Sequence, residues 1–302
     1  MQSLEFYINN PRKLGLALLS KFGYLLSDKL YLQFRYRLVI GKKLHLKHPQ
    51  TFNEKLQWLK LYDRRPEYTV MVDKVKAKEY VASKIGEEYI IPTLGVWEDP
   101  DDIDFDALPD QFVLKCNHSS GGLCICTDKR KLDIPKVKEE LRKGLRDNYY
   151  LHGREWPYKD VPRRILAEKF MVDESGTELK DYKVFCFNGE PEVVEVDYDR
   201  FIEHKRNIYD KKWKFVEIQI EYPNDESHFI DRPEKLEEML ELARCLSAGI
   251  PHVRVDFYSI SGRLFWGELT FFHGAGMETF KPEVWNLKWG KLIKLPFFNS
   301  RE

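Results

Sequence analysis

Two acidic residues late in the chain are the clearest candidates for chemistry. Asp256 lies in residues 253–258, where apolar and polar side chains alternate as in a half-buried strand. Turn residues follow, and Glu268 lies in the predicted returning strand, residues 264–271. Both acids are nearly the same distance from the turn, so they can project from one face. Two carboxylates on stiff strands suit Mg²⁺, which completes its octahedron with phosphate and water. On these residues alone, an ordinary exposed hairpin is the more economical interpretation.

A second group of motifs precedes this hairpin. Asp73-Lys74 opens a predicted helix that ends at Gly86, and Lys115 ends a short apolar strand, residues 111–115. The small residues of the next turn are Ser119, Ser120, Gly121 and Gly122. Such a turn lets backbone N–H groups approach phosphate oxygens closely. A single turn of this kind is usually an ordinary hairpin loop, so its meaning depends on the motifs around it.

Taken in chain order, these motifs resemble those of the ATP-grasp ligases. Arg254-x-Asp256 followed by Glu268-x-Thr270 is similar to the metal-binding segment of D-alanine–D-alanine ligases, which has Asn where this chain has Thr270. The chain also resembles the TupA-like branch of this superfamily, whose signatures are similar to residues 49–58, 181–185 and 267–271. That branch is associated with teichuronopeptide and with capsule or exopolysaccharide synthesis. Each motif alone is weak, and the shared order gives the resemblance its specificity.

The resemblance implies that ATP binds between two subdomains. Lys74 and Lys115 would hold the phosphates, and Glu168 would accept a hydrogen bond from the exocyclic amine of adenine. Arg206 would serve the γ-phosphate. The implied nucleotide-binding residues are Lys74, Lys115, Ser119, Ser120, Gly121, Gly122, Glu168, Lys169, Phe170, Met171, Asp173, Glu174 and Arg206, with Asp173 and Glu174 as alternatives for the ribose.

The resemblance also implies a metal and catalytic centre at the hairpin. Asp256, Glu268 and Thr270 would bind Mg²⁺, the cofactor expected beside ATP. The hydroxyl of Thr270 is a poorer ligand than an amide oxygen, which leaves the second metal ion open. Arg254 faces the same way as Asp256 and is expected to stabilise an oxyanion by charge-assisted hydrogen bonding. Lys183 is expected to neutralise transferred phosphate, with a cross-strand pair to an acid as its structural alternative.

The implied function is ATP-dependent carboxylate–amine ligation through an acyl phosphate. From the TupA-like branch, an amino acid would be joined to a uronic-acid or amino-acid-bearing precursor of a cell-surface polysaccharide. Two alternatives stay open. One is a glycosyltransferase, whose metal motif would be Asp197-Tyr198-Asp199. The other is a non-catalytic nucleotide-binding module of a glycan assembly.

Composition narrows the class and the location. The 302 residues have a formal net charge of zero, so no global field favours nucleic acid. Five scattered cysteines do not form a disulfide framework, and reduced thiols fit the cytoplasm. No apolar run has the length needed to cross a bilayer. We therefore expect a cytoplasmic protein.

The N-terminal residues 11–48 are basic, with Asp28 as their single acid. Apolar residues recur among the lysines and arginines at helical spacing. One interpretation is peripheral contact with the anionic inner face of a membrane. The other, which we favour from sequence alone, is a helical pair packed on the main body with its basic face in water.

The predicted fold class is α+β: an ATP-grasp fold, in which two α+β subdomains grip ATP, with a mainly helical N-terminal extension. The expected divisions are a helical basic region (1–69), a pre-grasp segment (70–110), a lid subdomain (111–172) and a C-terminal subdomain with the metal site (173–302). ATP-grasp enzymes commonly begin with an α/β domain that helps to hold the acceptor. The substrate site therefore does not carry over from the better-known ligases.

Overall fold

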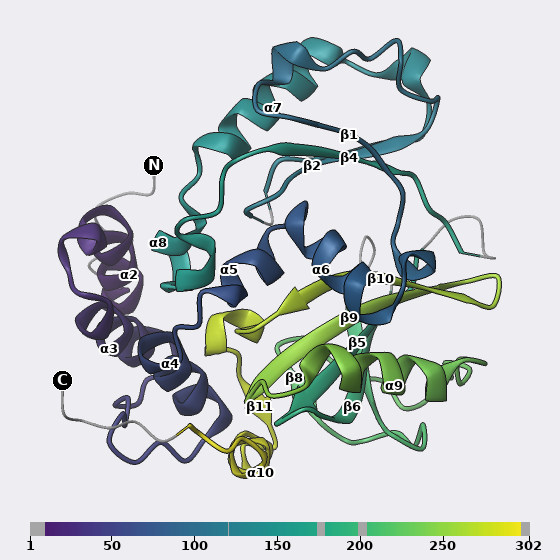
Figure 1. The fold of residues 1–302 in the computed structure, drawn as a ribbon. Helices are drawn as coiled ribbons and strands as arrows, with labels where there is room; N and C mark the ends of the chain where they lie inside the picture. Colours follow the sequence, from purple (N-terminus) through teal and green to yellow (C-terminus); the bar gives the residue numbers. More distant parts are fainter. Residues whose placement is uncertain (1–9, 120, 174–178, 199–203, 297–302) are drawn as a thin grey trace.

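Two antiparallel sheets organise the chain. The computed structural model describes residues 10–119, 121–173, 179–198 and 204–296. A four-stranded sheet has the order β1-β4-β2-β3 and a five-stranded sheet the order β10-β9-β5-β6-β7, and Figure 1 shows the first above the second. Ser120 and Glu174, both expected to contact the nucleotide, lie outside the described residues.

Three strands of the smaller sheet lie in the segment expected to be the lid, and this sheet is called the lid below. Buried residues alternate along its second strand, and the face that they share packs on Val137 and Leu141 of helix α7 (Ile134–Arg146). Asp133 caps that helix by accepting a hydrogen bond from the backbone N–H of Lys136 at 3.0 Å. The strands are β1 (Thr93–Trp97), β2 (Phe112–Cys116), β3 (Leu123–Cys126) and β4 (Ile165–Lys169). Strand β1 comes from the expected pre-grasp segment and pairs with β4.

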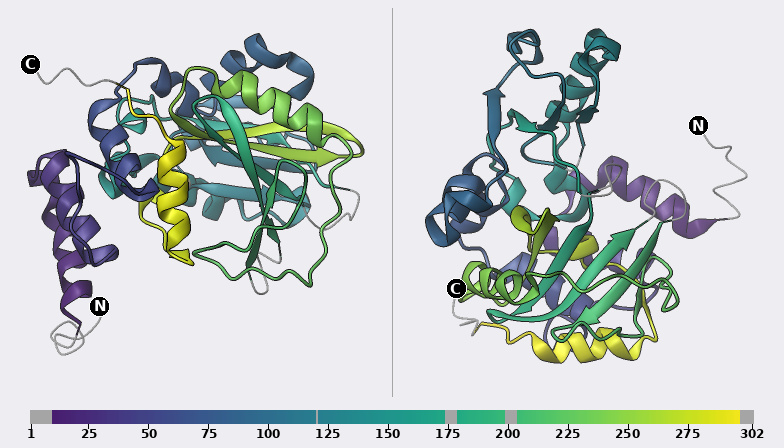
Figure 2. Two further views of the ribbon diagram at one scale, coloured as in Figure 1. Left: turned by 90° about the horizontal axis from the view of Figure 1, so that it is seen from below. Right: turned by 90° about the vertical axis from the view of Figure 1, so that its right-hand side faces the viewer.

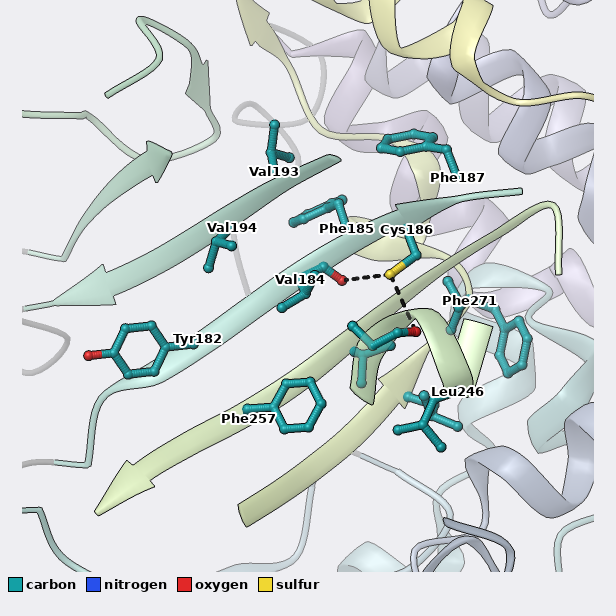
Figure 3. Packing of buried hydrophobic residues seen from close by; sticks show 14 of the residues in the cluster. Tyr182, Val184, Phe185, Cys186, Phe187, Val193, Val194, Leu246, Phe257 and Phe271 are labelled. Atoms are coloured by element: carbon teal, nitrogen blue, oxygen red, sulfur yellow. Dashed lines mark hydrogen bonds between the residues drawn. The ribbon is translucent and has the colours of Figure 1, made fainter. Parts of the chain in front are cut away.

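The larger sheet has one apolar face, which helix α9 (Leu236–Ser247) covers. Val184, Val194 and Phe257 belong to that face, and Figure 3 shows them around Cys186, whose thiol donates to the carbonyl of Ala243 at 3.8 Å. The strands are β5 (Asp181–Phe187), β6 (Glu190–Tyr198), β7 (Lys205–Asp210), β9 (His252–Ile260) and β10 (Arg263–Thr270). The two predicted hairpins, β5–β6 and β9–β10, are confirmed.

The opposite face of the same sheet is divided along the strands. At one end it is aromatic, where Phe185 and Phe187 meet Trp289 of helix α10 (Val284–Leu292). At the other end it is charged, because Lys183 pairs in register with Asp256 on β9. The period-2 geometry of strands therefore places Lys183, Arg254 and Asp256 on one surface, facing away from α9.

Helices precede and support the two sheets. Helix α4 (Phe52–Tyr62) has the predicted capping box: Thr51 accepts from the N–H of Glu54 at 3.2 Å, and Glu54 accepts from the N–H of Thr51 at 3.1 Å. Phe52 then packs edge-on against Trp289 with ring centroids 5.4 Å apart. Helices α2 (Pro11–Phe22) and α3 (Asp28–Val39) stand out from the rest of the molecule (Figure 2).

The helix expected to begin at Asp73-Lys74 is interrupted there, so that prediction is wrong in its boundary. Helix α5 (Glu67–Val72) ends before Asp73, and helix α6 (Lys76–Ile85) begins after Val75. The Asp73 carboxylate accepts from the backbone N–H of Val75 at 3.0 Å and from the side chain of Asn117 at 2.8 Å. A local hydrogen bond and a contact with Asn117 thus hold Asp73, and Lys74 lies in a break between two helices.

The remaining described elements are short. They are η1 (Gly23–Leu25), η2 (Glu87–Tyr89), η3 (Pro100–Asp102), η4 (Lys129–Lys131), α8 (Tyr149–Gly153), η5 (Trp156–Tyr158), β8 (Gln219–Ile220), η6 (His273–Gly276) and β11 (Phe280–Lys281). Across the described ranges, every helix is too short or too polar to cross a bilayer.

Candidate active site

The β9–β10 hairpin brings Arg254, Asp256 and Glu268 together. Asp256 pairs in register with Glu268, and Arg254 pairs with Thr270. The Arg254 guanidinium donates to both Asp256 oxygens at 2.7 and 2.6 Å and to Glu268 at 3.0 Å. Thr270 donates its hydroxyl proton to the same Glu268 carboxylate at 3.1 Å. A bulge between Trp266 and Glu268 sets this register.

The donor set at the hairpin fits Mg²⁺. It consists of two carboxylates and one hydroxyl, and Mg²⁺ is usually held by one or two carboxylates together with phosphate and water. In the part of the chain that the structure describes, no cluster of three or more His, Cys, Asp or Glu residues forms a dedicated metal cage. The Asp256 side chain is 3% exposed and that of Glu268 is 43% exposed, so Glu268 is the carboxylate that solvent or a ligand reaches.

Arg254 stays charged although it is buried. Burial disfavours the guanidinium, but the charges of Asp256 and Glu268 outweigh it and hold the pKa of Arg254 well above its ordinary value. On its other side, Arg254 contacts Nδ1 of His273 at 2.7 Å, and Nε2 of His273 lies 2.5 Å from Glu278. The guanidinium is therefore fixed from two directions.

Lys183 and Arg206 lie on the same polar face but are engaged with acids. Lys183 pairs with Asp181 at 2.9 Å and with Asp197 at 2.7 Å, and Arg206 pairs with Asp197 at 2.8 Å and with Glu195 at 3.1 Å. Burial opposes the charge of Lys183, yet the two aspartates raise its pKa. The cross-strand pair named as the alternative for Lys183 is thus present. Its expected contact with phosphate remains a prediction.

Lys74 and Lys115 come from other elements and lie close enough to this hairpin for their charges to act on Glu268. Burial lowers the pKa of Lys74, and Lys115 adds to the effect, while Glu268 opposes it. Lys115 pairs with Glu168 on β4. The same carboxylate accepts from Lys78 at 2.6 Å. Burial raises the pKa of Glu168, but the two lysines outweigh burial and lower it, so the group is an anion held between two lysines.

The sequence motifs did not identify Lys78 as a residue near the site. It lies four residues after Lys74, and the signal for it was the spacing that puts both on one side of a helix. Its ammonium also donates to the carbonyl of Ile91 at 2.6 Å and to the hydroxyl of Thr93 at 3.0 Å. Lys78 thereby fixes strand β1, and Glu168 with it, at the hinge side of the lid.

The small-residue turn after β2 is held close to Lys74. The Lys74 ammonium donates to the carbonyl of Ser119 at 2.8 Å, and the N–H of Gly121 donates to the Ser119 hydroxyl at 3.3 Å. Gly122 has φ +62°, and a Cβ there would lie 2.5 Å from Sγ of Cys116. Both the backbone conformation and the close approach therefore require glycine at this position.

The expected adenine hinge follows β4. Phe170 and Met171 are half-buried, whereas Lys169 is exposed. Lys169 and Phe170 line a cavity of about 700 Å³, and neither lines the cavity that contains Arg254 and Glu268. Asp173 is buried and accepts from the N–H of Lys180 at 3.4 Å. The adenine and ribose assignments stay predictions.

A central cavity of about 450 Å³ joins the lid to the hairpin. Five of the site residues that the sequence predicts line this cavity: Lys74, Ser119, Arg254, Glu268 and Thr270. Its other walls, which sequence reasoning missed, are Arg35, Tyr149, His152, Gly153, Glu155, Tyr158, Phe272, Gly274 and Ala275. These come from α3, the α8–η5 segment and η6, and none of the three carries a recognisable motif.

The chain belongs to the TupA-like ATP-grasp family, whose sequence model matches residues 54–294. That match confirms the predicted family and, with the mixed helical and antiparallel architecture, the predicted α+β fold class. A comparison with curated protein sequences gave no match.

Solved structures of ATP-grasp ligases are distantly similar. D-alanine–D-alanine ligase from Bacillus anthracis, solved with ATP, is 14% identical over 67% of this chain and 54% of its own, with a TM-score of 0.40. The enzyme of the same name from Helicobacter pylori is 13% identical over 80% and 69%, with a TM-score of 0.42. The ATP-grasp ligase PsnB, in a complex with Mg and ADP, is 11% identical over 84% and 65%, with a TM-score of 0.41. The chain thus spans about half the length of the first of these enzymes.

Proposed function

We propose that this protein is an ATP-dependent carboxylate–amine ligase. The observation that supports the proposal is the common cavity of Lys74, Ser119, Arg254 and Glu268, which joins the small-residue turn to the β9–β10 hairpin. ATP is the expected phosphate donor and Mg²⁺ the expected metal. Asp256, Glu268 and Thr270 would hold the metal, which when bound would neutralise charge on the phosphate oxygens.

Joining a carboxylate to an amine in water is unfavourable, so the carboxylate must first be activated. The substrate carboxylate attacks the γ-phosphorus, which gives an acyl phosphate and ADP. Lys74 and the Ser119 turn position the phosphates for this step. The amine then attacks the acyl carbon, and Arg254 stabilises the oxyanion that forms. Asp256 and Glu268 fix Arg254 in place for this purpose.

The proposed substrates are an amino acid and a uronic-acid or amino-acid-bearing precursor of a cell-surface polysaccharide. The support for this finer statement is membership of the TupA-like family. The test is release of ADP from ATP in the presence of a panel of amino acids and uronates. We expect turnover only when both a carboxylate and an amine are present. Nucleotide binding without turnover on any pair would favour the non-catalytic alternative.

A glycosyltransferase is the second enzyme class to separate by experiment. Its candidate metal ligand Asp197 is already engaged by Lys183 and Arg206, and its second ligand Asp199 lies outside the described residues. Thermal-shift titration with ATP, UDP-sugars and Mg²⁺ distinguishes the two, because a ligand that binds the native state raises the unfolding midpoint. We expect ATP with Mg²⁺ to stabilise the protein and UDP-sugars to leave it unchanged.

We also propose that the protein works in the cytoplasm at the inner face of a membrane. Leu14, Leu18, Phe22 and Leu25 are exposed at a spacing that puts them on one side of α2 and η1. Lysines flank them at exposed positions. An apolar stripe with basic neighbours is the pattern that anionic bilayer surfaces bind. A protein acting on lipid-linked glycan precursors would meet its substrate there.

A further inference from the structure

We call the part of the central cavity that is lined by Arg35, Glu155, Tyr149 and Tyr158 the compartment. Arg35 of α3 and Glu155, which precedes η5, line it together with Tyr149 and Tyr158. None of these four residues belongs to the set expected to bind ATP or metal. A site with few charged groups among aromatic walls is typical of small-molecule recognition.

Glu155 is a buried carboxylate whose acceptor capacity is not used. It is 5% exposed, and no described residue donates a hydrogen bond to its carboxylate or forms an ion pair with it. Burial raises its pKa, while the charges of Lys60 and Arg35 oppose that rise. Lys60 itself donates to the carbonyls of Gly153 and Ala275 at 2.8 and 2.7 Å. A buried acid in this state is costly unless a ligand satisfies it.

Arg35 supplies the opposite charge in the same compartment. Its Nη1 donates to the Tyr31 hydroxyl at 3.1 Å and to the carbonyl of His152, which fixes the guanidinium. Within the described ranges, Nη2 donates to no protein group. Nε has no partner either, but it is buried, so Nη2 is the donor that a ligand can reach. An oriented guanidinium with an accessible donor suits a carboxylate.

We propose that this compartment binds a free α-amino acid as its zwitterion, with the carboxylate on Arg35 and the ammonium group on Glu155. A simple carboxylate, such as a uronate, would meet the negative charge of Glu155 without compensation. A simple amine would leave Arg35 unsatisfied. Only a ligand that carries both charges satisfies both groups. The side chain of such a ligand would lie against the contacting rings of Tyr149 and Tyr158, whose centroids are 4.8 Å apart.

This inference rests on the proposed ligase function and assigns the amine substrate to a place. The ammonium group gives its proton to the Glu155 carboxylate, and the neutral amine attacks the carbonyl carbon of the acyl phosphate. The C–N bond forms, the bond from carbon to the phosphate oxygen breaks, and phosphate leaves with that electron pair. The departing phosphate takes the second proton from the nitrogen, which leaves a neutral amide. Glu155 then releases its proton to solvent. Arg254 lines the same cavity and faces the developing oxyanion.

Calorimetric titration of the full chain tests the inference. The protein is first saturated with Mg²⁺ and a non-hydrolysable ATP analogue, and L- and D-amino acids are then titrated singly. We expect at least one amino acid to bind, and its N-acetyl and carboxamide derivatives to bind at least about tenfold more weakly. Binding of the analogue without binding of any amino acid overturns the inference and leaves the ligase proposal intact. Tighter binding of glucuronate than of every amino acid also overturns it. Failure of the analogue to bind overturns the ligase proposal, and with it the inference.

Matched variants distinguish a loss of amino-acid binding from a loss of the folded structure. Arg35→Gln is expected to weaken amino-acid binding at least about tenfold, with Arg35→Lys in between, while affinity for the nucleotide analogue is unchanged. The control is Arg37→Gln, on the same helix and exposed. Glu155→Gln is expected to abolish the discrimination between the amino acid and its N-acetyl derivative. Unchanged amino-acid affinity in Arg35→Gln contradicts the inference, because this half-buried side chain can be replaced without opening the core.

Discussion

The two carboxylates of the hairpin, Glu268 and Asp256, differ in their exposure to solvent. Glu268 is the accessible carboxylate, so Glu268→Gln should leave the fold intact and remove one charge from the metal site. We expect the Mg²⁺-dependent affinity for ATP to fall about ten- to a hundredfold, since a charge-assisted contact contributes about 1.5–3 kcal/mol. Calorimetry with ATP at several Mg²⁺ concentrations measures this. Glu237→Gln on the exposed side of α9 is the control, and an unchanged Mg²⁺ dependence in Glu268→Gln contradicts the metal assignment.

The buried ring of His252 leads to a prediction about how the free energy of unfolding depends on pH. The ring lies among Phe52, Phe185 and Phe187, and its Nδ1 is 3.0 Å from the carbonyl of Cys186. Burial lowers its pKa from 6.5 to about 3. The unfolded chain therefore binds a proton on His252 between pH 6.5 and 3 that the folded chain does not bind. Its contribution to the free energy of unfolding is fully present above pH 6.5 and falls by up to about 1.4 kcal/mol per pH unit below it.

The variant His252→Phe removes this titration. Urea unfolding between pH 7.5 and 4.5 should show a wild-type stability that falls more steeply with decreasing pH than that of the variant. His45→Phe, at an exposed position, should keep the wild-type slope. Parallel curves for wild type and His252→Phe would show that the buried ring does not resist protonation.

Among the elements, the hairpins were predictable and the break between α5 and α6 was not. A strand hairpin depends on its own alternating residues and turn, so the pairing of Asp256 with Glu268 follows from local sequence. The capping box at Thr51 is local in the same way. The break at Asp73 depends on Asn117, a residue of the lid that is far away in the chain. The spacing of apolar residues along a helix carries no information about a hydrogen-bond partner so far away in the chain.

The same break gives a prediction. The Asn117 side chain donates to Asp73 and to the carbonyl of Pro162, both at 2.8 Å, and accepts from the N–H of Arg164 at 2.7 Å. Asn117→Ala should lower the free energy of unfolding by about 2–3 kcal/mol, because it leaves buried polar groups without partners. It should also weaken ATP binding, since Lys74 loses its fixed backbone. The control Gln111→Ala removes a single exposed hydrogen bond and should change stability by less than about 0.5 kcal/mol.

At the scale of the whole molecule, the central cavity shows where sequence reasoning stopped. The residues proposed to hold phosphate and metal belong to motifs that occur in a fixed order along the chain, so Lys74, Arg254 and Glu268 were predicted from the sequence. The rest of the cavity is assembled by folding from Arg35, Glu155 and the turn at Ala275, which are separated by more than a hundred residues. Single charged residues in unrelated segments have no spacing to recognise, and only the packing of helix α3 against the α8–η5 region brings them together.

The exposed stripe on α2 gives the last prediction. It lies on α2, which projects from the body of the molecule (Figure 2). We expect the full chain to sediment with vesicles containing anionic lipid and not with neutral vesicles, because the flanking lysines contribute about 1 kcal/mol each near such a surface. Phe22→Glu should reduce sedimentation at least about tenfold, since it removes apolar contact and adds like charge.

The control for membrane binding is Phe229→Glu, which changes an exposed aromatic residue outside the N-terminal helices. It should bind vesicles as the wild type does. Arg35 belongs to the central cavity, so Arg35→Gln should also leave vesicle binding unchanged while it weakens binding of the amino acid. If Phe22→Glu and Phe229→Glu bind equally, the stripe has no role at the membrane. The favoured interpretation is then a helical pair whose basic residues lie in water.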